Sequence, residues 1–475
     1  MTSSRALVNP VPKKKRLLRK NCFSAKPMAF FGSVYYNDFD YRLNKSVRLH
    51  RSERGLSTFM KYLPGGLMSG EKPPAQQAIK EENMKRIFLE LHRKREMTRI
   101  QLSRSTGLST ATVSALVDEL VRMGLFFETG PAKTDSIGRK PINLRIRPES
   151  RQLPVISLNR WGARFLLYDL DIQPLEELFV PHASDQYGGF EDTDSDGNPD
   201  TGDDYAALIR SVLAKSRLFD PARAIALCVV SPGIFVQEKD AYSLSALHVS
   251  FSRSVMANLE REIRVPMFFG NSSMSHAYAE KKALDATGAE VADLMYIYVR
   301  DGVGAGILCG GDLFLGAEET AGEIGHVTIN ARGRRCVCGN RGCLEQYVNV
   351  DTIIGEVRRA LPDGEPAGQL TLEWIGDAYE KGHAVVSAVL DDIAEKLFRG
   401  IYSAICLTGI KRIVIGGGIE CLGGAFLNKL RSFPEENGGR MLMRNVTIDF
   451  TRSGPAGDAT GIANYFLDKV FTITA

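Results

Sequence analysis

Long apolar runs and secretion signals are absent from this sequence. No segment approaches the ~20 apolar residues that cross a bilayer, and the basic N-terminus lacks the apolar core and cleavage site of a secretory signal. The chain has eight cysteines in 475 residues, and only three of them lie close together in the sequence. Nothing here indicates an oxidising compartment. We therefore expect a cytoplasmic protein of the bacterial type.

Charge is unevenly distributed along the chain. Residues 1–150 carry 29 Lys and Arg against 13 Asp and Glu, a formal charge of +16, whereas residues 151–475 carry 31 against 43, or −12. The length exceeds a single hydrophobic core, so two or three domains are expected. A basic first part and an acidic second part predict a polyanion-binding segment joined to a domain of another kind.

Residues 1–77 show little pattern, and we expect a basic, disordered extension. The run PKKKRLLRK at 12–20 is typical of a solvated tail, and a DNA-binding arm or a targeting signal stays open as an alternative. A start codon assigned too far upstream is also possible, because Met68 and Met84 both precede or open the first well-patterned helix.

Residues 78–148 predict a winged helix-turn-helix. A first helix carries an apolar face, Thr98 and Gln101 form a capping box that opens a second, and Ser109 caps a third after the turn at Gly107. Two strand-like segments, 125–128 and 142–146, would form the wing. The apolar face of the first helix consists of Met84, Ile87, Phe88 and Leu91.

Polar side chains on this domain predict contacts with double-stranded DNA. The third helix presents small hydroxyl groups able to approach base edges and phosphates in a major groove, and GRKP at 138–141 could reach a minor groove or a phosphate. A three-helix protein-interaction module is the alternative, but the local basic charge favours DNA. The predicted DNA-binding residues are Ser109, Thr110, Thr112, Ser114, Arg139 and Lys140.

Strands and helices alternate through residues 155–475, as expected for α/β lobes with ligands bound between them. Glycines that follow two of the predicted strands, Gly302 and Gly304 in one case and Gly416 and Gly417 in the other, are candidates for a nucleotide-binding loop, although tight hairpins use the same residues. The segment at 191–204 matches part of a calcium loop, but we expect a solvated acidic loop.

The stretch from Ala321 to Gln346 predicts a metal site. It places His326 ten positions before three clustered thiols, and three thiolates with one imidazole suit tetrahedral zinc. Gly339 and Gly342 allow the tight reversals that three sulfurs on one ion require. A disulfide within so short a loop would be strained. The predicted zinc ligands are His326, Cys336, Cys338 and Cys343.

Four motifs in one order resemble the ROK family, named for repressors, open reading frames and sugar kinases. They are DGVGAG at 301–306, AGEIGH at 321–326, CVCGNRGCLE at 336–345 and VIGGGIE at 414–420. Behind a winged helix-turn-helix they resemble its repressor branch, whose members respond to sugars such as N-acetylglucosamine, glucose or xylose. The resemblance covers residues 78–475.

The resemblance implies a two-lobed fold related to actin, hexokinase and ribonuclease H over residues 155–475, with a sugar in the cleft. Lobe 1 would span about 155–272 plus the C-terminal segment, and lobe 2 about 273–440. His326 would serve both the structural zinc and the sugar. The implied sugar contacts are Asn271, Ser272, Glu323, His326 and Glu345.

Two departures from the family's kinases argue against catalysis. The kinases carry an Asp after the asparagine as general base, where this chain has Ser272. Their Asp-x-Gly-Gly-Thr phosphate loop is replaced by the sequence from Ser157 to Gly162, SLNRWG. We therefore expect no enzyme activity and no role for ATP.

These observations predict a repressor that binds an operator as a homodimer or homotetramer and senses a sugar or sugar phosphate. The rival hypothesis is an ATP-dependent sugar kinase with an attached DNA-binding domain. The resemblance also suggests a membrane sugar transporter as a protein partner, which is a lesser alternative.

Overall fold

The computed structural model describes residues 75–132, 140–159, 161–181, 202–236, 241–244, 249–366, 368–436, 442–454, 456–471 and 473. All of them belong to the second of two compact units, residues 61–475. The predicted extension up to residue 74, the DNA contact Arg139 and residues 191–201 of the acidic loop lie outside the described residues.

A winged helix-turn-helix forms the first described segment, as predicted. Thr98 and Gln101 make the expected capping box at the start of α3, Gly107 ends α3 in the left-handed region at φ 71°, and Ser109 caps α4. The sheet has the order β1-β3-β2, so β1 adds a strand that was not predicted. The elements are α2 (Ala75–Lys94), β1 (Met97–Thr98), α3 (Arg99–Thr106), α4 (Thr110–Arg122), β2 (Phe126–Pro131) and β3 (Ile142–Ile146).

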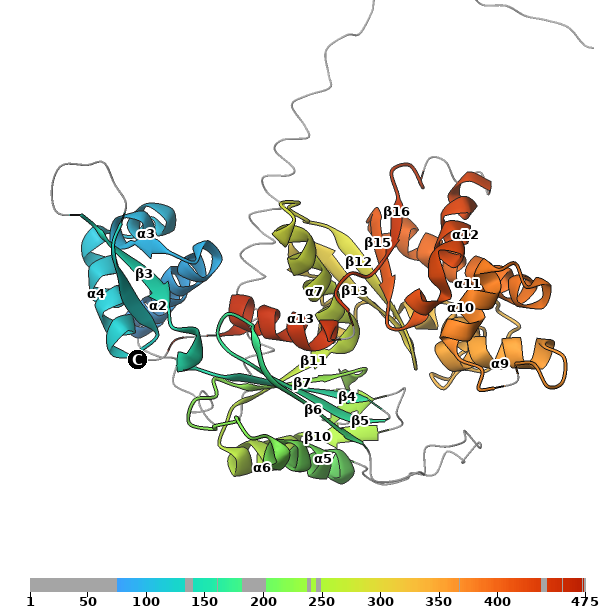
Figure 1. The fold of residues 1–475 in the computed structure, drawn as a ribbon, viewed down its shortest axis with the longest axis horizontal. Helices are drawn as coiled ribbons and strands as arrows, with labels where there is room; N and C mark the ends of the chain where they lie inside the picture. The colour runs from blue at the N-terminus through green and yellow to red at the C-terminus, as the bar shows by residue number, and fades with distance from the viewer. Residues whose placement is uncertain are drawn as a thin grey trace, which may run out of the picture. The chain divides into compact units, whose positions relative to one another are not determined.

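Two five-stranded sheets form the rest of the described chain (Figure 1). The first has the order β11-β7-β4-β5-β6 and the second β14-β13-β12-β15-β16. The strands of the first are β4 (Leu153–Asn159), β5 (Gly162–Tyr168), β6 (Pro174–Pro181), β7 (Leu227–Ser231) and β11 (Met267–Asn271). Those of the second are β12 (Leu294–Val299), β13 (Val303–Cys309), β14 (Asp312–Leu313), β15 (Arg412–Gly416) and β16 (Thr447–Phe450). A small sheet contains β8 (Ile234–Val236), β9 (Ala241–Leu244) and β10 (Val249–Ser252).

The two large sheets share one topology. In each, the first three strands form an antiparallel meander, and the fourth and fifth lie parallel to the first on its other side. Repetition of this order in two lobes is the arrangement expected for an actin-like or hexokinase-like fold. The predicted fold class is therefore confirmed.

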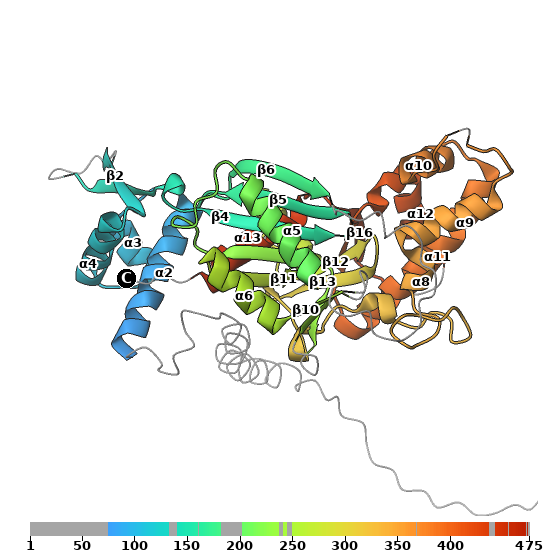
Figure 2. The ribbon, with the colours of Figure 1, turned by 90° about the horizontal axis from the view of Figure 1, so that it is seen from below.

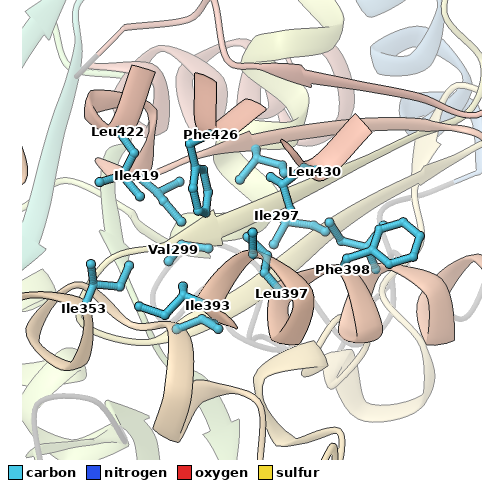
Figure 3. Packing of buried hydrophobic residues seen from close by; sticks show 14 of the residues in the cluster. Ile297, Val299, Ile353, Ile393, Leu397, Phe398, Ile419, Leu422, Phe426 and Leu430 are labelled. Carbon is cyan, nitrogen blue, oxygen red and sulfur yellow. The ribbon is translucent and has the colours of Figure 1, made fainter. Parts of the chain in front are cut away.

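Helices cover each sheet through apolar side chains. On the first sheet, α5 (Gly202–Lys215) and α6 (Arg253–Ile263) lie over the same face (Figure 2), and buried residues of both helices join the sheet in one core cluster. The second sheet is covered by a helical layer whose largest members pack around β12 (Figure 3). That layer comprises α8 (Glu345–Val348), α9 (Val350–Ala360), α10 (Leu372–Glu380), α11 (Ala384–Thr408) and α12 (Gly423–Glu436).

Burial of this layer is a main source of stability, because apolar area removed from water contributes roughly 25 cal/mol per Å². Ile297 of β12, Leu397 of α11 and Phe426 of α12 are fully buried and meet in the centre of the cluster (Figure 3). None of the described helices is both long enough and apolar enough to span a bilayer.

Two helices that follow the last strand of each sheet pack against each other between the lobes. They are α7 (Ser272–Ala286) and α13 (Gly457–Tyr465), and they lie alongside one another (Figure 1). A Cβ on Gly461 would lie 1.8 Å from the carbonyl oxygen of Ser275, and one on Gly270 would lie 2.3 Å from Ile462 Cδ1. Only glycine permits this approach, which explains the small residues in the last helix.

The C-terminal residues contact the first helix of the winged domain. The ring of Phe471 packs edge-on against Phe88 of α2 at 5.4 Å between centroids, and Lys85 Nζ donates to the carbonyl oxygen of Lys469 at 2.8 Å. Asp171, in the turn between β5 and β6, receives ion pairs from Arg95 at 2.5 Å and from His92 at 3.7 Å. The winged domain is therefore tied to both the first lobe and the segment after α13.

The close packing of α7 and α13 predicts the effect of a single methyl group. Gly461→Ala should lower the thermal unfolding midpoint, because the new Cβ overlaps a backbone carbonyl, and overpacking costs about 1–3 kcal/mol or more. Gly355→Ala is the matched control. Gly355 lies in α9 with nothing within 4 Å of the new Cβ, so this change should stabilise by about 0.5–1 kcal/mol. Circular dichroism melting of both variants checks the prediction, and equal midpoints would contradict it.

Candidate functional site

The segment 321–326 is held against β13 by two glycines. The N–H of Ala305 donates to the carbonyl oxygen of Gly322 at 2.7 Å. A Cβ on Gly322 would lie 1.9 Å from the carbonyl oxygen of Ala305, and a Cβ on Gly325 would lie 2.2 Å from that of Val303. Because no larger residue fits at either position, the glycines of this motif set how closely its polar side chains approach the strand.

Beyond this segment, one imidazole and three thiols converge. His326, Cys336, Cys338 and Cys343 offer ligand atoms that all lie within 4.8 Å of one another. Cys336 Sγ is 3.6 Å from His326 Nδ1, and Cys338 Sγ is 3.7 Å from Cys343 Sγ, so no disulfide joins the last two. Gly339 and Gly342 adopt φ of 87° and 72°, the left-handed turns expected of them. The four predicted ligands can hold a metal ion.

Two of these separations match those around a tetrahedral ion of zinc's size. Bonds of about 2.3 Å to sulfur and 2.0–2.1 Å to nitrogen require roughly 3.8 Å between two sulfurs and 3.6 Å between sulfur and nitrogen. Burial and the neighbouring thiols raise the pKa of Cys343 to about 12. Burial also raises the pKa of Cys336, with part of that effect offset by hydrogen bonds. A bound cation would favour the thiolate form of both.

His326 connects the thiol cluster to a neighbouring cleft. Its Nδ1 faces Cys336, while its Nε2 lies 3.8 Å from Glu323 Oε2. At this distance the carboxylate interacts with the imidazole electrostatically and makes no hydrogen bond to it. Burial raises the pKa of Glu323 above its ordinary value, although the nearby His326 lowers it.

A cleft of about 40 Å³ contains four of the five predicted sugar contacts. Asn271, Glu323, His326 and Glu345 line it, together with Ser273, Pro232 and Tyr298 and the loop glycines Gly302 and Gly304. Ser272, the fifth predicted contact, lines the adjoining cavity.

Two of the cleft residues already have backbone partners. Asn271 caps α7, since its Oδ1 accepts from the N–H groups of Ser273 at 2.8 Å and Met274 at 3.3 Å, and its Nδ2 donates to the carbonyl oxygen of Gly233 at 3.0 Å. Glu345 Oε2 accepts from the N–H of Val303 at 2.9 Å. These bonds orient both side chains and leave each with capacity for a ligand hydroxyl.

The adjoining cavity has a volume of about 190 Å³. Pro232 and Tyr298 line both this cavity and the cleft, so the two adjoin. Polar residues that line the cavity include Ser157, Ser272, His276, Arg300, Glu420 and Asp458. Sequence reasoning missed its aromatic wall, because Tyr298 read only as part of an apolar strand and His276 as part of a helix.

The loops that resemble nucleotide-binding segments are occupied by the protein's own groups. Asn159 Oδ1 accepts from the N–H groups of Trp161 at 2.9 Å and Gly162 at 3.1 Å. The guanidinium of Arg300 lies 4.7 Å above the ring of Trp161 and donates to the carbonyl oxygen of Gly417 at 3.3 Å. A Cβ on Gly416 would lie 2.1 Å from the hydroxyl of Tyr296. Gly416 is therefore required for packing, whatever else the loop contacts.

The predicted DNA contacts lie at the N-terminal end of α4. Ser109 and Thr110 are exposed, and Thr112 and Ser114 are half-buried. Ser109 Oγ accepts from the N–H of Thr112 at 3.1 Å, so this hydroxyl serves the helix cap first. Lys140 is exposed at the base of the wing.

Two arginines near α4 were not among the predicted DNA contacts, and they differ in their ion pairs. Arg104, exposed in the last turn of α3, has no ion pair with any described residue. Arg99 is bound to Asp118 and Glu128, each at 2.8 Å, and cannot serve a phosphate without losing them. Nothing in the sequence distinguishes these two arginines, since their partners come from α4 and β2.

Two family models and several curated proteins match this sequence. Residues 199–463 match the model of the ROK family, and residues 80–126 match that of a winged helix-turn-helix DNA-binding domain. A xylose repressor of Caldicellulosiruptor bescii is 25% identical over 370 residues, which are 75% of this chain and 88% of that protein. The DNA-binding transcriptional dual regulator NagC of Escherichia coli K12 is 26% identical over 347 residues, 72% of this chain and 81% of the relative.

Two solved structures share the fold. A ROK family transcriptional regulator, described as a homolog of the E. coli MLC protein, superposes with a TM-score of 0.65 at 21% identity, covering 82% of this chain and 98% of its own. A ROK family glucokinase of Streptomyces griseus, in complex with glucose and AMPPNP, gives 0.52 at 18% identity, covering 66% and 98%. With a family model matched over more than half of its length, the chain belongs to the ROK family.

Proposed function

We propose that this chain is a cytoplasmic, sugar-responsive transcriptional repressor whose kinase-like domain is a zinc-stabilised sensor without phosphoryl-transfer activity. The observation that carries the proposal is the combination of a winged helix-turn-helix with a sugar-kinase fold whose first phosphate loop is closed by Asn159 and Trp161. The regulators among the relatives, named for xylose and N-acetylglucosamine, support the same function.

DNA recognition follows from the form of α4. Its buried face holds the helix on α2 and α3 through Val113, Leu116 and Leu120, which leaves the N-terminal turn with Thr110 exposed. The N-terminal residues of such a helix contact base edges in the major groove. The exposed Arg104 and Lys140 supply positive charge for phosphates on either side. A dimer or tetramer would place two such helices on two half-sites.

Phosphoryl transfer lacks two of its parts. A general base must accept the proton of the attacked hydroxyl, and the residue after Asn271 is Ser272, buried at 5% exposure, which is no base at neutral pH. The amides that would hold a phosphate in the first loop already donate to Asn159. The rival hypothesis of an active sugar kinase requires both obstacles to be removed.

Sugar binding supplies the switch. Residues of both lobes line the cleft, so a bound sugar would favour one arrangement of the lobes over another. Asp171 and Phe471, which belong to the first lobe and its C-terminal segment, both contact α2, so the winged domain would follow the first lobe when the lobes change their arrangement. When the winged domains of an oligomer are displaced in this way, their separation no longer matches the spacing of two operator half-sites.

Zinc holds the sugar contacts without taking part in chemistry. The ion would bind His326 and the three cysteines, all four coordination positions being filled by protein, as in structural sites. Since His326 also lines the cleft beside Glu323, the metal fixes one wall of the sensor.

DNA binding and its release by sugar form the central test. Operators selected from random duplexes should bind the chain in gel-shift titration, and at least one of the sugars xylose, glucose, N-acetylglucosamine or their phosphates should release it. Thr110→Glu should weaken binding by roughly tenfold or more, since the carboxylate faces phosphates, while an acidic residue in the first turn favours the helix itself.

Gln76→Glu provides the matched control for charge. Gln76 is exposed near the start of α2, and Gln76→Glu adds the same negative charge at a position outside α4. Operator affinity should therefore stay within about twofold of the wild type. Equal affinities for Thr110→Glu and wild type would remove α4 from the DNA interface. If no sugar or sugar phosphate releases the operator, the proposed induction is wrong.

Catalytic silence is tested by restoring the missing carboxylate. Ser272→Asp should show no sugar-dependent formation of ADP above the wild-type background, because the first phosphate loop stays occupied by Asn159. A coupled ADP assay with glucose and N-acetylglucosamine, run beside an active sugar kinase, measures this. Turnover in the wild type would instead support the kinase hypothesis.

Metal analysis tests the zinc site. Cys338→Ala should lower zinc from about one ion per chain by roughly tenfold or more, since even residues that only support metal ligands contribute that much to affinity. The unfolding midpoint should fall with it. Cys309→Ala, an exposed thiol outside the cluster, should keep both values. Freshly prepared wild-type protein without zinc would refute the assignment.

A further inference from the structure

The cavity beside the sugar cleft has no task in the function proposed above. At about 190 Å³ it has room for roughly a dozen water molecules, enough for one pyranose unit. It adjoins the cleft through the shared walls Pro232 and Tyr298, and Ser272 lines it next to the cleft residue Asn271. A second, larger space therefore lies directly beside the cleft.

We infer that the effector of this chain is a neutral disaccharide or longer saccharide, with one unit in the cleft and the next unit in the cavity. The inference rests on the proposed sugar-sensing function and names the class of its ligand. Three features carry it: the charge of the cavity, its hydrogen-bonding groups and its aromatic wall.

The charge of the cavity disfavours a phosphate. The carboxylates of Asp301, Glu420 and Asp458 line it and outnumber its two arginines, one of which is paired with a carboxylate outside the cavity. Arg164 is paired with Glu177 at 2.6 Å, and Arg300 binds the carbonyl oxygen of Gly417 beneath its stack on Trp161. A phosphate placed among these carboxylates would face like charges in a partly buried site, which costs free energy.

The backbone N–H groups around the cavity also favour a neutral ligand over a phosphate. Anion sites of this fold type use free N–H groups in a glycine-rich turn. Here the N–H groups of Trp161 and Gly162 donate to Asn159, and that of Gly418 donates to Glu420 Oε2 at 2.8 Å. Each of these N–H groups already donates to an acceptor within the protein, so none of the three is available to bind an anion in the cavity.

Hydroxyl groups, in contrast, find partners. Glu420 and Asp458 each use one carboxylate oxygen for a backbone N–H, of Gly418 and Ala459 respectively, so the other oxygen can accept from a sugar hydroxyl. Ser157 Oγ and His276 Nδ1, on side chains with 5% and 7% exposure, have no hydrogen-bond partner among the described residues. Buried polar groups without partners are costly, and a ligand that satisfies them gains affinity.

An aromatic wall completes the cavity. His276 stacks between Tyr296 at 5.1 Å and Tyr298 at 5.3 Å, so three stacked rings line one side of the cavity. Burial lowers the pKa of His276, although the Asp458 carboxylate opposes the effect. The ring is thus neutral near pH 7 and adds no charge to attract an anion. A largely uncharged aromatic wall beside directional polar groups suits a sugar ring.

Calorimetric titration of the full chain distinguishes the ligand classes. The panel pairs cellobiose, xylobiose and diacetylchitobiose with glucose, xylose and N-acetylglucosamine, and adds the 6-phosphates of glucose and N-acetylglucosamine. At least one disaccharide should bind roughly tenfold or more tightly than its own monosaccharide, the gain expected from one or two additional net hydrogen bonds.

Variants of the cavity should remove that ratio. Ser157→Leu fills the space, and Asp458→Asn keeps the shape but removes a charge, so both should bring the disaccharide affinity toward that of the monosaccharide. Glu323→Gln, in the cleft, should weaken both ligands and preserve the ratio. The Asn variant serves where the larger Leu disturbs folding.

Three results would overturn the inference while sugar sensing stands: equal binding of disaccharide and monosaccharide, tightest binding of a sugar phosphate, or a ratio unchanged in both cavity variants. A chain that binds no member of the panel would refute the proposed function itself, and the inference would fall with it.

Discussion

The close contact of residues 321–326 with β13 is the constraint on which the sensor depends. Gly322 and Gly325 lie so near the strand's carbonyl groups that any side chain would overlap them. This backbone contact places Glu323 at the cleft and leads directly to His326, whose ring faces the thiol cluster. One short segment is thus fixed by packing on one side and by metal ligands on the other. Rigid support of this kind is what directional recognition of hydroxyl groups requires.

Local signals in the sequence predicted local structure well. The capping box at Thr98, the left-handed glycine at position 107 and the burial of Met84 and Phe88 all follow from rules that involve only near neighbours. The metal cluster was predictable for the same reason, since its three cysteines lie within eight positions. By contrast, α5, α10 and α12 were not predicted, because their apolar faces are set by the sheets that they cover. Long-range packing of this kind leaves a weak pattern in a single sequence.

Glycine-rich loops illustrate a different limit. A glycine after a strand indicates that something approaches the backbone closely, but not what approaches. At Gly416 the neighbour is the hydroxyl of Tyr296, and at Gly304 it is the side chain of Ser273, so both glycines serve internal packing. The occupied state of the first loop was equally invisible, because Asn159 gave no sign that it would cap the amides two and three residues later. The absence of the Asp-x-Gly-Gly-Thr pattern predicted that the loop had changed, and the hydrogen bonds explain how.

The energetics of switching connect the cleft, the cavity and the winged domain. Moving a two-state equilibrium from 1:99 to 99:1 requires a ligand to prefer one state by about 5.5 kcal/mol. A typical net hydrogen bond contributes only about 1 kcal/mol, so a ligand confined to a cleft with two carboxylates, one imidazole and one amide has few contacts with which to distinguish the states. Contacts in the adjoining cavity, between residues of both lobes such as Ser157 and Glu420, would increase the difference. Because Asp171 and Phe471 attach the first lobe to α2, a ligand that spans both spaces acts on the DNA-binding domain through the largest available number of state-dependent contacts.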